Sequence, residues 1–336
     1  MVRSEFAPNV GDLIGASQDD IALTSGAGAG LATIAYALKW SAGDEVIIAG
    51  GVFPAHYATW KPMEAREGIK VQITHPQSQF IQSGDLIAAM AARTRVISVS
   101  HVRFDDGSIL DASSLAAACK KHRTLLVLDV SQSCGAIPMG VRSLGADFVV
   151  RAGYKYLLSP FGTGFVWVKP QNADLLRPGP YNWLSQDVES FARLNYVDPR
   201  PARTLSRWDA AEASSIYNFN LTVMEASLKF VLNATPTLIH DHNQALISYF
   251  FERLPEGYRL ASPRQASQRG VFGCIEADSR CNTESVYQTL RDEGFVVALR
   301  EGRIRVAPHL LNSTQDIDRL LVSLVKAWKG VTHVDH

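Results

Sequence analysis

Cysteine, long apolar runs and an excess of either charge are scarce or missing in this chain of 336 residues. Its four cysteines, Cys119, Cys134, Cys274 and Cys281, are scattered without CxxC spacing, which indicates neither a zinc site nor a disulfide framework. No apolar run approaches the ~20 residues that span a bilayer, and the N-terminus lacks the apolar centre of a signal peptide. Basic and acidic residues both number 33, so neither a nucleic-acid nor an anionic-membrane partner is indicated. We therefore expect a soluble, cytoplasmic protein without a bound metal.

The chain does contain a regular alternation of short apolar runs and helical segments. Strands are expected at Asp20–Leu23, Asp44–Ala49, Val71–Thr74, Val96–Ser100, Leu125–Asp129, Ala146–Val150 and Phe165–Val168. Such alternation predicts an α/β fold with a mostly parallel sheet wrapped by helices. The length suits about two domains. We expect a large α/β domain over residues 1–235 and a smaller α+β domain over residues 236–336.

An acid and a lysine follow two successive strands of this pattern. Asp129 ends the apolar run LLVLD, where a buried carboxylate is costly without a cationic partner. Lys155 lies among Gly153, Tyr154 and two leucines, and an apolar neighbourhood lowers the pKa of a lysine and makes its amine nucleophilic. Pyridoxal phosphate requires both groups, because its aldehyde condenses with a lysine and its ring nitrogen pairs with a carboxylate. Taken alone, the two residues also fit a structural aspartate and a surface lysine that extends past leucines.

A glycine-rich turn, TSGAGAG at residues 24–30, lies between the first strand and a helix. The free N–H groups at the start of a helix favour an anion such as a phosphate, although a turn of small residues also serves helix packing alone. No Gly-Lys-Ser/Thr follows, so this is not a Walker A loop. Ligands of parallel sheets collect at the carboxyl ends of the strands, where this turn, Phe53, His101, Asp129 and Lys155 are expected. We expect His101 to be structural.

With these residues placed, the chain resembles the class V aminotransferase branch of the fold-type I pyridoxal-phosphate enzymes. That group includes cysteine desulfurases, selenocysteine lyases, kynureninases and isopenicillin N epimerase. The resemblance extends from about Ala16 to Leu324 and is most specific in LDVSQSCGAIP, GADFVVRAGYKYLLSPFGTGFVWV and RIRVAPHLLNSTQDIDRLL. It implies the fold-type I architecture, bound pyridoxal phosphate, an amino-acid substrate and a homodimer. The aromatic-rich stretch 177–217 is expected to be buried by that dimer.

The resemblance also implies roles for single residues. Lys155 would hold the cofactor covalently and move the α-proton of the substrate, and Asp129 would pair with the ring nitrogen. Gln132 would hydrogen-bond the phenolic oxygen of the ring.

Further contacts are implied around the ring, the phosphate and the substrate. Phe53 would stack on the pyridine, while Ala27 and Gly28, with Tyr154, would hold the phosphate. Arg305 would grip the substrate α-carboxylate, for which its forked guanidinium is suited. Phe53 and Arg305 also fit a core phenylalanine and a surface arginine. Trp183 and Glu212 are further candidates for the active site or the subunit interface.

The chain departs from the family pattern in several places. The serine and threonine side chains usual around the phosphate are replaced by Ala27, Gly28 and Ala152, which leaves backbone N–H groups and Tyr154 to bind it. Where desulfurases carry a threonine, this chain reads RWDAAE at residues 207–212. It also starts later than typical members, so the segment that usually closes over the substrate is expected to be missing.

The sequence leaves the reaction open among several alternatives. We favour a C–S (β-) lyase acting on a cysteine-like amino acid. A kynureninase-type hydrolase is supported by VFPAHY at residues 52–57, and an aminotransferase, an epimerase or a non-catalytic pyridoxal-phosphate-binding protein are further alternatives. A desulfurase requires a nucleophilic cysteine shortly before the strand of Arg305, and the nearest candidate is Cys281. We expect Cys281 to be dispensable.

Overall fold

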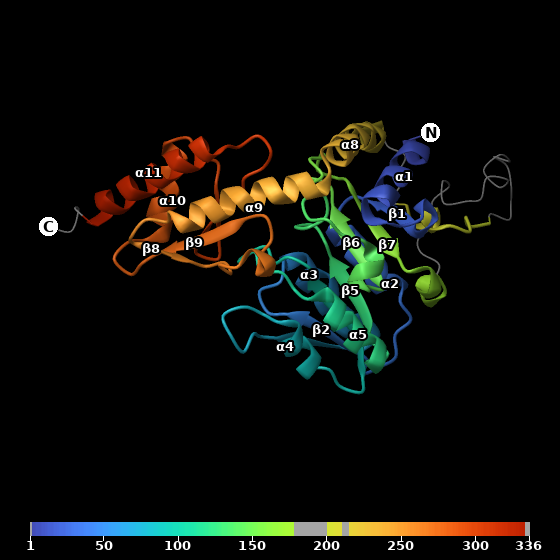
Figure 1. The fold of residues 1–336 in the computed structure, drawn as a ribbon. Coiled ribbons are helices and arrows are strands. Elements are labelled where there is room, and N and C mark those ends of the chain that lie inside the picture. Colours follow the sequence, from blue (N-terminus) through green and yellow to red (C-terminus); the bar gives the residue numbers. More distant parts are fainter. Residues whose placement is uncertain (1, 178–199, 210–214, 333–336) are drawn as a thin grey trace. The chain divides into compact units, whose positions relative to one another are not determined.

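A computed structural model describes residues 2–177, 200–209 and 215–332 of the chain (Figure 1). The chain forms two compact units. The first comprises Met1–His101 and Asp111–Ala234, and the second comprises Val102–Leu110 and Thr235–His336. The segment 102–110 thus joins the second unit, although the sequence pattern assigned it to the first domain.

The first unit is built on a seven-stranded sheet with the order β1-β7-β6-β5-β4-β2-β3. Its strands are β1 (Ile21–Thr24), β2 (Glu45–Ala49), β3 (Lys70–Thr74), β4 (Thr94–Ser100), β5 (Leu125–Asp129), β6 (Phe148–Ala152) and β7 (Gly164–Val168). The neighbours from β6 to β3 run parallel, whereas β7 is antiparallel to both β6 and β1. The predicted α/β class with a mostly parallel sheet is therefore confirmed.

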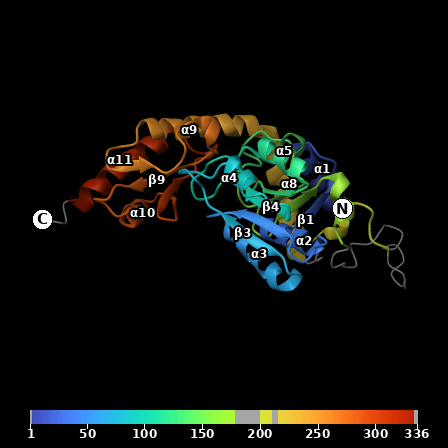
Figure 2. The same cartoon turned by 90° about the horizontal axis from the view of Figure 1, so that it is seen from below.

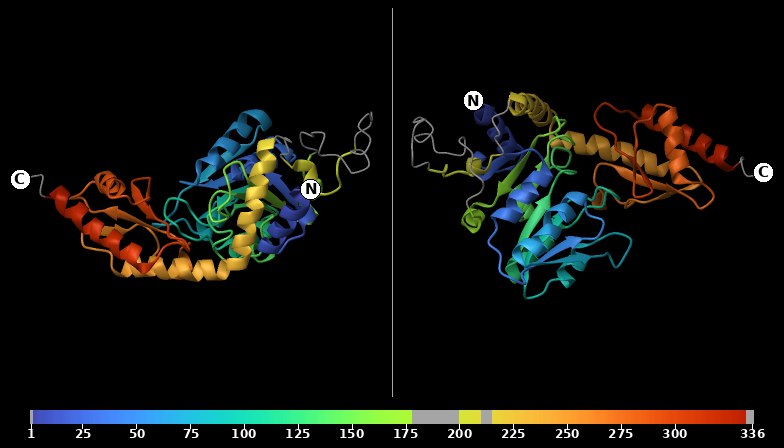
Figure 3. Two further views of the ribbon diagram at one scale, coloured as in Figure 1. Left: turned by 90° about the horizontal axis from the view of Figure 1, so that it is seen from above. Right: turned by 180° about the vertical axis from the view of Figure 1, so that it is seen from behind.

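The central strands are mostly apolar because helices cover both faces of the sheet. All five residues of β5, β6 and β7 are buried. The helix α5 lies over one face, and α2 and α3 lie over the other (Figures 1 and 3). The helices of this unit are α1 (Val2–Ile14), α2 (Ala27–Ala37), α3 (Pro54–Glu67), α4 (Ser83–Ala88), α5 (Ala112–His122), α6 (Val141–Leu144) and α8 (Ser215–Ala234).

Local sequence signals explain where these helices begin and end. Pro54 occupies the first turn of α3, where its missing N–H costs no hydrogen bond, and Gly68 closes that helix in the left-handed conformation. Asp111 caps α5 by accepting a hydrogen bond from the Ser114 N–H.

The strand β6 begins and ends two residues later than the sequence predicted. The expected strand, Ala146–Val150, followed the apolar run and ended before Arg151. Arg151 is nevertheless fully buried, and its guanidinium donates to the carbonyl oxygens of Cys134 and Ala152. These carbonyl acceptors stabilise the buried guanidinium, so the strand continues through Arg151.

The second unit contains a four-stranded antiparallel sheet with the order β10-β11-β9-β8, together with three helices (Figures 1 and 2). Its elements are α9 (Pro236–Glu252), β8 (Tyr258–Leu260), β9 (Gly273–Ala277), α10 (Thr283–Asp292), β10 (Ala298–Arg300), β11 (Arg303–Val306) and α11 (Thr314–Thr332). Its core combines apolar residues of the three helices with those of β9 and β11. The sequence analysis did not predict β8, whose three residues include Arg259.

Hydrogen bonds and ion pairs hold the segment 102–110 in this second unit. Arg103 pairs with Asp105 at 2.7 Å and with Asp106 at 3.1 Å, and Arg303 of β11 lies 3.6 Å from Asp105. The hydroxyl of Ser262 donates to the Asp106 carbonyl oxygen. Because Arg303 and Ser262 lie about 150 to 200 residues further along the chain, local sequence patterns could not reveal these two contacts.

In the part of the chain that the structure describes, no helix is both long and apolar enough to cross a bilayer. The same residues contain no group of three or more His, Cys, Asp or Glu side chains arranged to hold a metal ion.

Candidate functional site

Asp129 lies at the carboxyl end of β5 and is 5% exposed. Its Oδ1 accepts a hydrogen bond from the Ser131 N–H at 2.8 Å, and its Oδ2 lies 3.8 Å from Nε2 of His56. Burial acts to raise the pKa of Asp129, but His56 and the Ser131 donors outweigh it and hold that pKa below its ordinary value. The carboxylate is therefore charged although it is buried.

His56 is a residue of this site that the sequence analysis missed. It lies in the first turn of α3, is fully buried, and its Nδ1 is 2.9 Å from the hydroxyl oxygen of Ser98 in β4. Its position in VFPAHY, three residues after Phe53 at the start of a helix, was the only available signal. Ser98 and Asp129 lie 42 and 73 residues further along the chain, so neither partner could be inferred from spacing.

Lys155 lies in a tight loop that leaves the end of β6. The loop is closed by hydrogen bonds from the Gly153 N–H to the Thr163 carbonyl (2.7 Å) and from the Ser159 N–H to the Gly153 carbonyl (3.2 Å). A Cβ atom at Gly153 would overlap the side chain of Thr163, so this position requires glycine. Lys155 is half-buried, and its Nζ lies 5.2 Å from the centroid of the Tyr154 ring.

The N-terminus of α2 provides a place for an anion. Gly26 is its N-cap with φ of 149°, and no side chain caps the helix. A Cβ atom added at Gly26 would meet nothing within 4 Å, which shows open space beside the first turn that contains Ala27 and Gly28. The N–H groups of a first helical turn have no partners within the helix, so an anion placed here is stabilised.

Several contacts bring these elements to one edge of the sheet. The Ala152 N–H at the end of β6 donates to the Ser131 hydroxyl at 3.0 Å, which joins the turns after β5 and β6. Gly164 of β7 approaches the Gly26 backbone so closely that a Cβ on Gly164 would lie 2.8 Å from the Gly26 Cα. The turn after β5 also carries Gln132, which is 7% exposed.

Phe53 is the N-cap residue of α3, the helix that carries His56, and it is 38% exposed. It is therefore accessible at the start of a helix and is not a core phenylalanine.

The groups assembled at this edge are those that pyridoxal phosphate requires. A lysine lies in the loop after β6, a charged carboxylate lies at the end of the neighbouring β5, and an unobstructed helix N-terminus suits a phosphate. The residues present therefore fit the cofactor expected from the sequence.

Arg305, the predicted carboxylate ligand, lies in the second unit on β11, opposite Cys274 of β9. It is half-buried, its Nη1 donates to the Phe104 carbonyl at 3.2 Å, and its Cζ lies 5.3 Å from the Phe272 ring centroid. These contacts restrict the guanidinium within its own unit.

Other predicted candidates have different outcomes. His101 is buried, its Nδ1 lies 3.0 Å from the Ser133 hydroxyl oxygen, and burial lowers its pKa to about 4, which agrees with a structural, neutral histidine.

Trp183 and Glu212 lie outside the described residues. Of the segment 207–212, Asp209 accepts a hydrogen bond from the Leu23 N–H at 2.7 Å.

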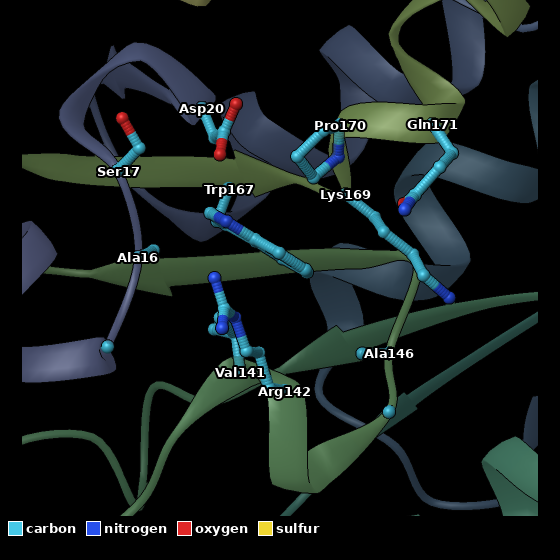
Figure 4. A pocket seen from close by; sticks show the side chains of 12 residues that line it. Ala16, Ser17, Asp20, Val141, Arg142, Ala146, Trp167, Lys169, Pro170 and Gln171 are labelled. Atoms are coloured by element: carbon cyan, nitrogen blue, oxygen red, sulfur yellow. The ribbon is translucent and has the colours of Figure 1, made fainter.

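A surface cavity of about 360 Å³ lies elsewhere in the first unit (Figure 4). It is lined by Asp20, Ala146 and Lys169, which lie immediately outside β1, β6 and β7. These residues mark the edge of the sheet opposite Asp129, so the cavity is separate from the candidate site.

All four cysteines of the chain are buried and free of disulfides. Burial raises the pKa of each thiol, to about 12 for Cys119 and Cys274. Cys281 immediately precedes Asn282, the N-cap residue of α10.

The chain is similar to known proteins along most of its length. The model of the aminotransferase class-V family matches residues 4–319. The uncharacterized aminotransferase YcbU of Bacillus subtilis is 25% identical over 317 residues, which cover 94% of this chain and 81% of that protein. A probable cysteine desulfurase of Ureaplasma parvum is 25% identical over 349 residues, which cover 98% of this chain and 83% of that protein.

Solved structures share the fold. The cystine C–S lyase C-DES, in complex with its product cysteine persulfide, superimposes with a TM-score of 0.86 at 19% identity, covering 96% of this chain and 86% of that chain. Together with the sheet topology, this likeness confirms the predicted fold-type I architecture.

Proposed function

The chain belongs to the aminotransferase class-V family, and on this basis we propose that it is a C–S (β-) lyase acting on a cysteine-like amino acid. The family and the fit of the site to the cofactor make the protein a pyridoxal-phosphate-dependent enzyme. When bound, the cofactor supplies an aldehyde that condenses with amines and a ring that withdraws electrons from the substrate Cα. The protein supplies orientation and proton transfer. A cytoplasmic location stays a prediction.

In this proposal the first unit holds the cofactor through several groups. Asp129 keeps a proton on the ring nitrogen, and Gln132 donates to the phenolic oxygen. Phe53 covers the ring face. The first turn of α2, at Ala27 and Gly28, receives the phosphate together with Tyr154. The charged state of Asp129 and the open space at Gly26 support these assignments.

Two cationic side chains act on the substrate. Arg305 binds its α-carboxylate through the forked guanidinium. Lys155 takes the proton from Cα, so the electron pair released there expels the sulfur substituent from Cβ. Once the sulfur substituent has left, addition of water to the remaining substrate skeleton would give pyruvate and ammonia.

The observation that favours a lyase over a desulfurase is the burial of every cysteine. A desulfurase attacks substrate sulfur with a thiolate, and thiolates form at accessible cysteines of lowered pKa. Here all four thiols are buried and their pKa values are raised. A β-elimination needs no protein thiol.

A kynureninase-type hydrolase is the second candidate. It is favoured by Phe53 and the following Pro54-Ala55-His56-Tyr57, since this group of enzymes uses phenylalanine at the ring face. An aminotransferase, an epimerase and a non-catalytic pyridoxal-phosphate-binding protein remain as alternatives.

Product analysis tests these assignments directly. The purified, cofactor-loaded protein is incubated with cysteine, cystine, kynurenine and alanine, and products are identified by mass spectrometry. We expect pyruvate and ammonia from a sulfur-containing substrate. Alanine with sulfane sulfur would instead identify a desulfurase, and anthranilate with alanine a kynureninase. An unchanged visible spectrum with every amino acid would favour a non-catalytic protein.

Cys281→Ala is expected to retain most of the wild-type turnover, because the Cys281 thiol is buried at the start of α10 and carries no step of the proposed reaction. Pyruvate formation is measured for this variant beside Cys119→Ala, which removes another buried thiol from α5. A Cys281 variant that binds substrate normally but releases no sulfur would replace the lyase assignment with the desulfurase assignment.

A homodimer is also part of this proposal. Exposed apolar side chains gather along α8 and the loop after Lys155: Leu158, Phe161, Phe219, Val223 and Phe230. The Asn220 amide donates to the Phe161 carbonyl and the Ser227 hydroxyl to the Leu158 carbonyl, both at 3.0 Å, so helix and loop form one surface. A second copy of the chain would remove this apolar surface from water.

The double change Phe161→Asp and Phe219→Asp is expected to raise the dissociation constant of the dimer about 30-fold or more. That increase corresponds to ~2 kcal/mol, the usual cost of losing one central aromatic anchor. Sedimentation velocity over a concentration series measures it. The matched control is Leu311→Asp, which changes a side chain that is 94% exposed in the second unit. A fully active wild-type monomer would rule out the dimer.

A further inference from the structure

A buried line of three polar side chains leads from β4 to the carboxylate of the site. Ser98 and His56 are each 0% exposed, and Asp129 is 5% exposed. The Ser98 hydroxyl oxygen lies 2.9 Å from His56 Nδ1, and His56 Nε2 lies 3.8 Å from Asp129 Oδ2. Nε2 makes no hydrogen bond in the structure, and a buried ring nitrogen without a partner is costly. Among the described residues, Asp129 is the acidic side chain at ion-pair distance from this nitrogen.

Arg151 is also a charged group near Asp129, but it makes its hydrogen bonds to other groups. Arg151 of β6 is fully buried and contributes an attractive field, but its guanidinium donates to the carbonyl oxygens of Cys134 and Ala152. The Ser131 N–H occupies Oδ1 of Asp129. Within the described residues, His56 is the side chain that lies at ion-pair distance from the Asp129 carboxylate.

We infer that His56 is a positioning residue, which Ser98 orients and which holds Asp129 charged and correctly turned for the cofactor ring nitrogen. This inference rests on the proposed function, in which Asp129 pairs with that nitrogen. The Ser131 N–H fixes Oδ1 of Asp129 by a hydrogen bond, and Oδ2 faces His56 Nε2 at 3.8 Å, so His56 lies on the side of the carboxylate that Ser131 does not hold. Without His56, Oδ2 would lose its neighbour while the cost of burial stayed, and the neutral acid would gain population.

The first test uses the protein without cofactor. Aspartate carboxyl carbons are labelled with ¹³C, the Asp129 resonance is identified from its loss in Asp129→Asn, and its titration is followed by NMR. In His56→Leu we expect the midpoint of this titration to rise by about one pH unit or more. His56→Gln, whose amide reaches as far as Nε2, should restore most of the wild-type value. An unchanged midpoint in His56→Leu overturns the inference whether or not the protein proves to be a lyase.

The second test measures cofactor binding and needs no turnover. Pyridoxal phosphate is titrated into the cofactor-free proteins and followed by its visible absorption. The dissociation constant is expected to rise about tenfold or more in His56→Leu and to recover in His56→Gln, because the leucine variant leaves Oδ2 of the buried carboxylate without a polar neighbour.

His101→Leu is the matched control for both tests, since His101 is also buried and bonded to a serine but has no acidic partner among the described residues. Its cofactor affinity should stay within about twofold of wild type. Equal weakening in the His56 and His101 variants would show a general packing effect and overturn the inference. Tight binding with no lyase products would reject the proposed reaction and leave the role of His56 standing.

Discussion

Lys155→Ala is expected to lower turnover by about 10²- to 10⁴-fold, the usual contribution of a positioned acid–base group. The variant loses the amine that takes the proton from the substrate Cα, and no second lysine takes its place in the loop from Gly153 to Thr163. The loop itself should persist, because its closing hydrogen bonds join the backbone of Gly153 to Thr163 and Ser159. Single-turnover kinetics with the cofactor-loaded variant measure the loss, and circular dichroism checks the fold.

Lys155→Arg distinguishes amine chemistry from positive charge. The guanidinium keeps the charge but cannot lose its proton at neutral pH, so this variant should be as inactive as the alanine variant. Borohydride reduction of the yellow wild-type protein should fix the cofactor on the peptide that contains Lys155. Lys120→Ala, which removes an exposed lysine from α5, is the control and should behave as wild type. Fixation of the cofactor on another lysine would contradict the assignment of Lys155.

The features that could be predicted from sequence are those encoded within short stretches. The strand β5 is five consecutive buried residues and was predicted with its observed bounds, because a continuous apolar run between turn signals is typical of a central parallel strand. Asp129 ends this strand and Lys155 follows the next one. Both could be predicted to lie at one edge of the sheet, since neighbouring parallel strands end at the same edge.

Features that depend on distant partners could not be predicted. The role of His56 depends on its neighbours Ser98 in β4 and Asp129 in β5, which lie far from it in sequence. The segment 102–110 contacts the second unit through an ion pair of Asp105 with Arg303, about 200 residues away in sequence. The predicted strand ended before Arg151, whereas β6 includes it and its guanidinium donates to the carbonyl oxygens of Cys134 and Ala152. In each case a polar side chain is stabilised by a partner that no local pattern identifies.

The second large effect is expected from Asp129. Asp129→Ala should lower kcat/KM by about 10²- to 10³-fold or more, since breaking one side of a buried ion pair costs ~3–5 kcal/mol. The variant removes the acceptor of the Ser131 N–H and leaves His56 Nε2 facing an empty site. Gln132→Ala should cost about tenfold or less, because Gln132 would contribute one hydrogen bond worth ~0.5–1.5 kcal/mol, which leaves the ring nitrogen paired.

Asp129→Asn separates the charge of this residue from its shape. The amide keeps the volume and one acceptor for Ser131, so the fold should be preserved, while the charge that holds the ring nitrogen protonated is lost. We therefore expect Asp129→Asn to resemble Asp129→Ala in kcat/KM and to resemble wild type in thermal stability. The three variants are compared in one assay, with cofactor occupancy fixed by its absorbance. Equal losses in the Asp129→Ala and Gln132→Ala variants would mean that the ring nitrogen is held elsewhere, because only a charged partner produces the larger cost.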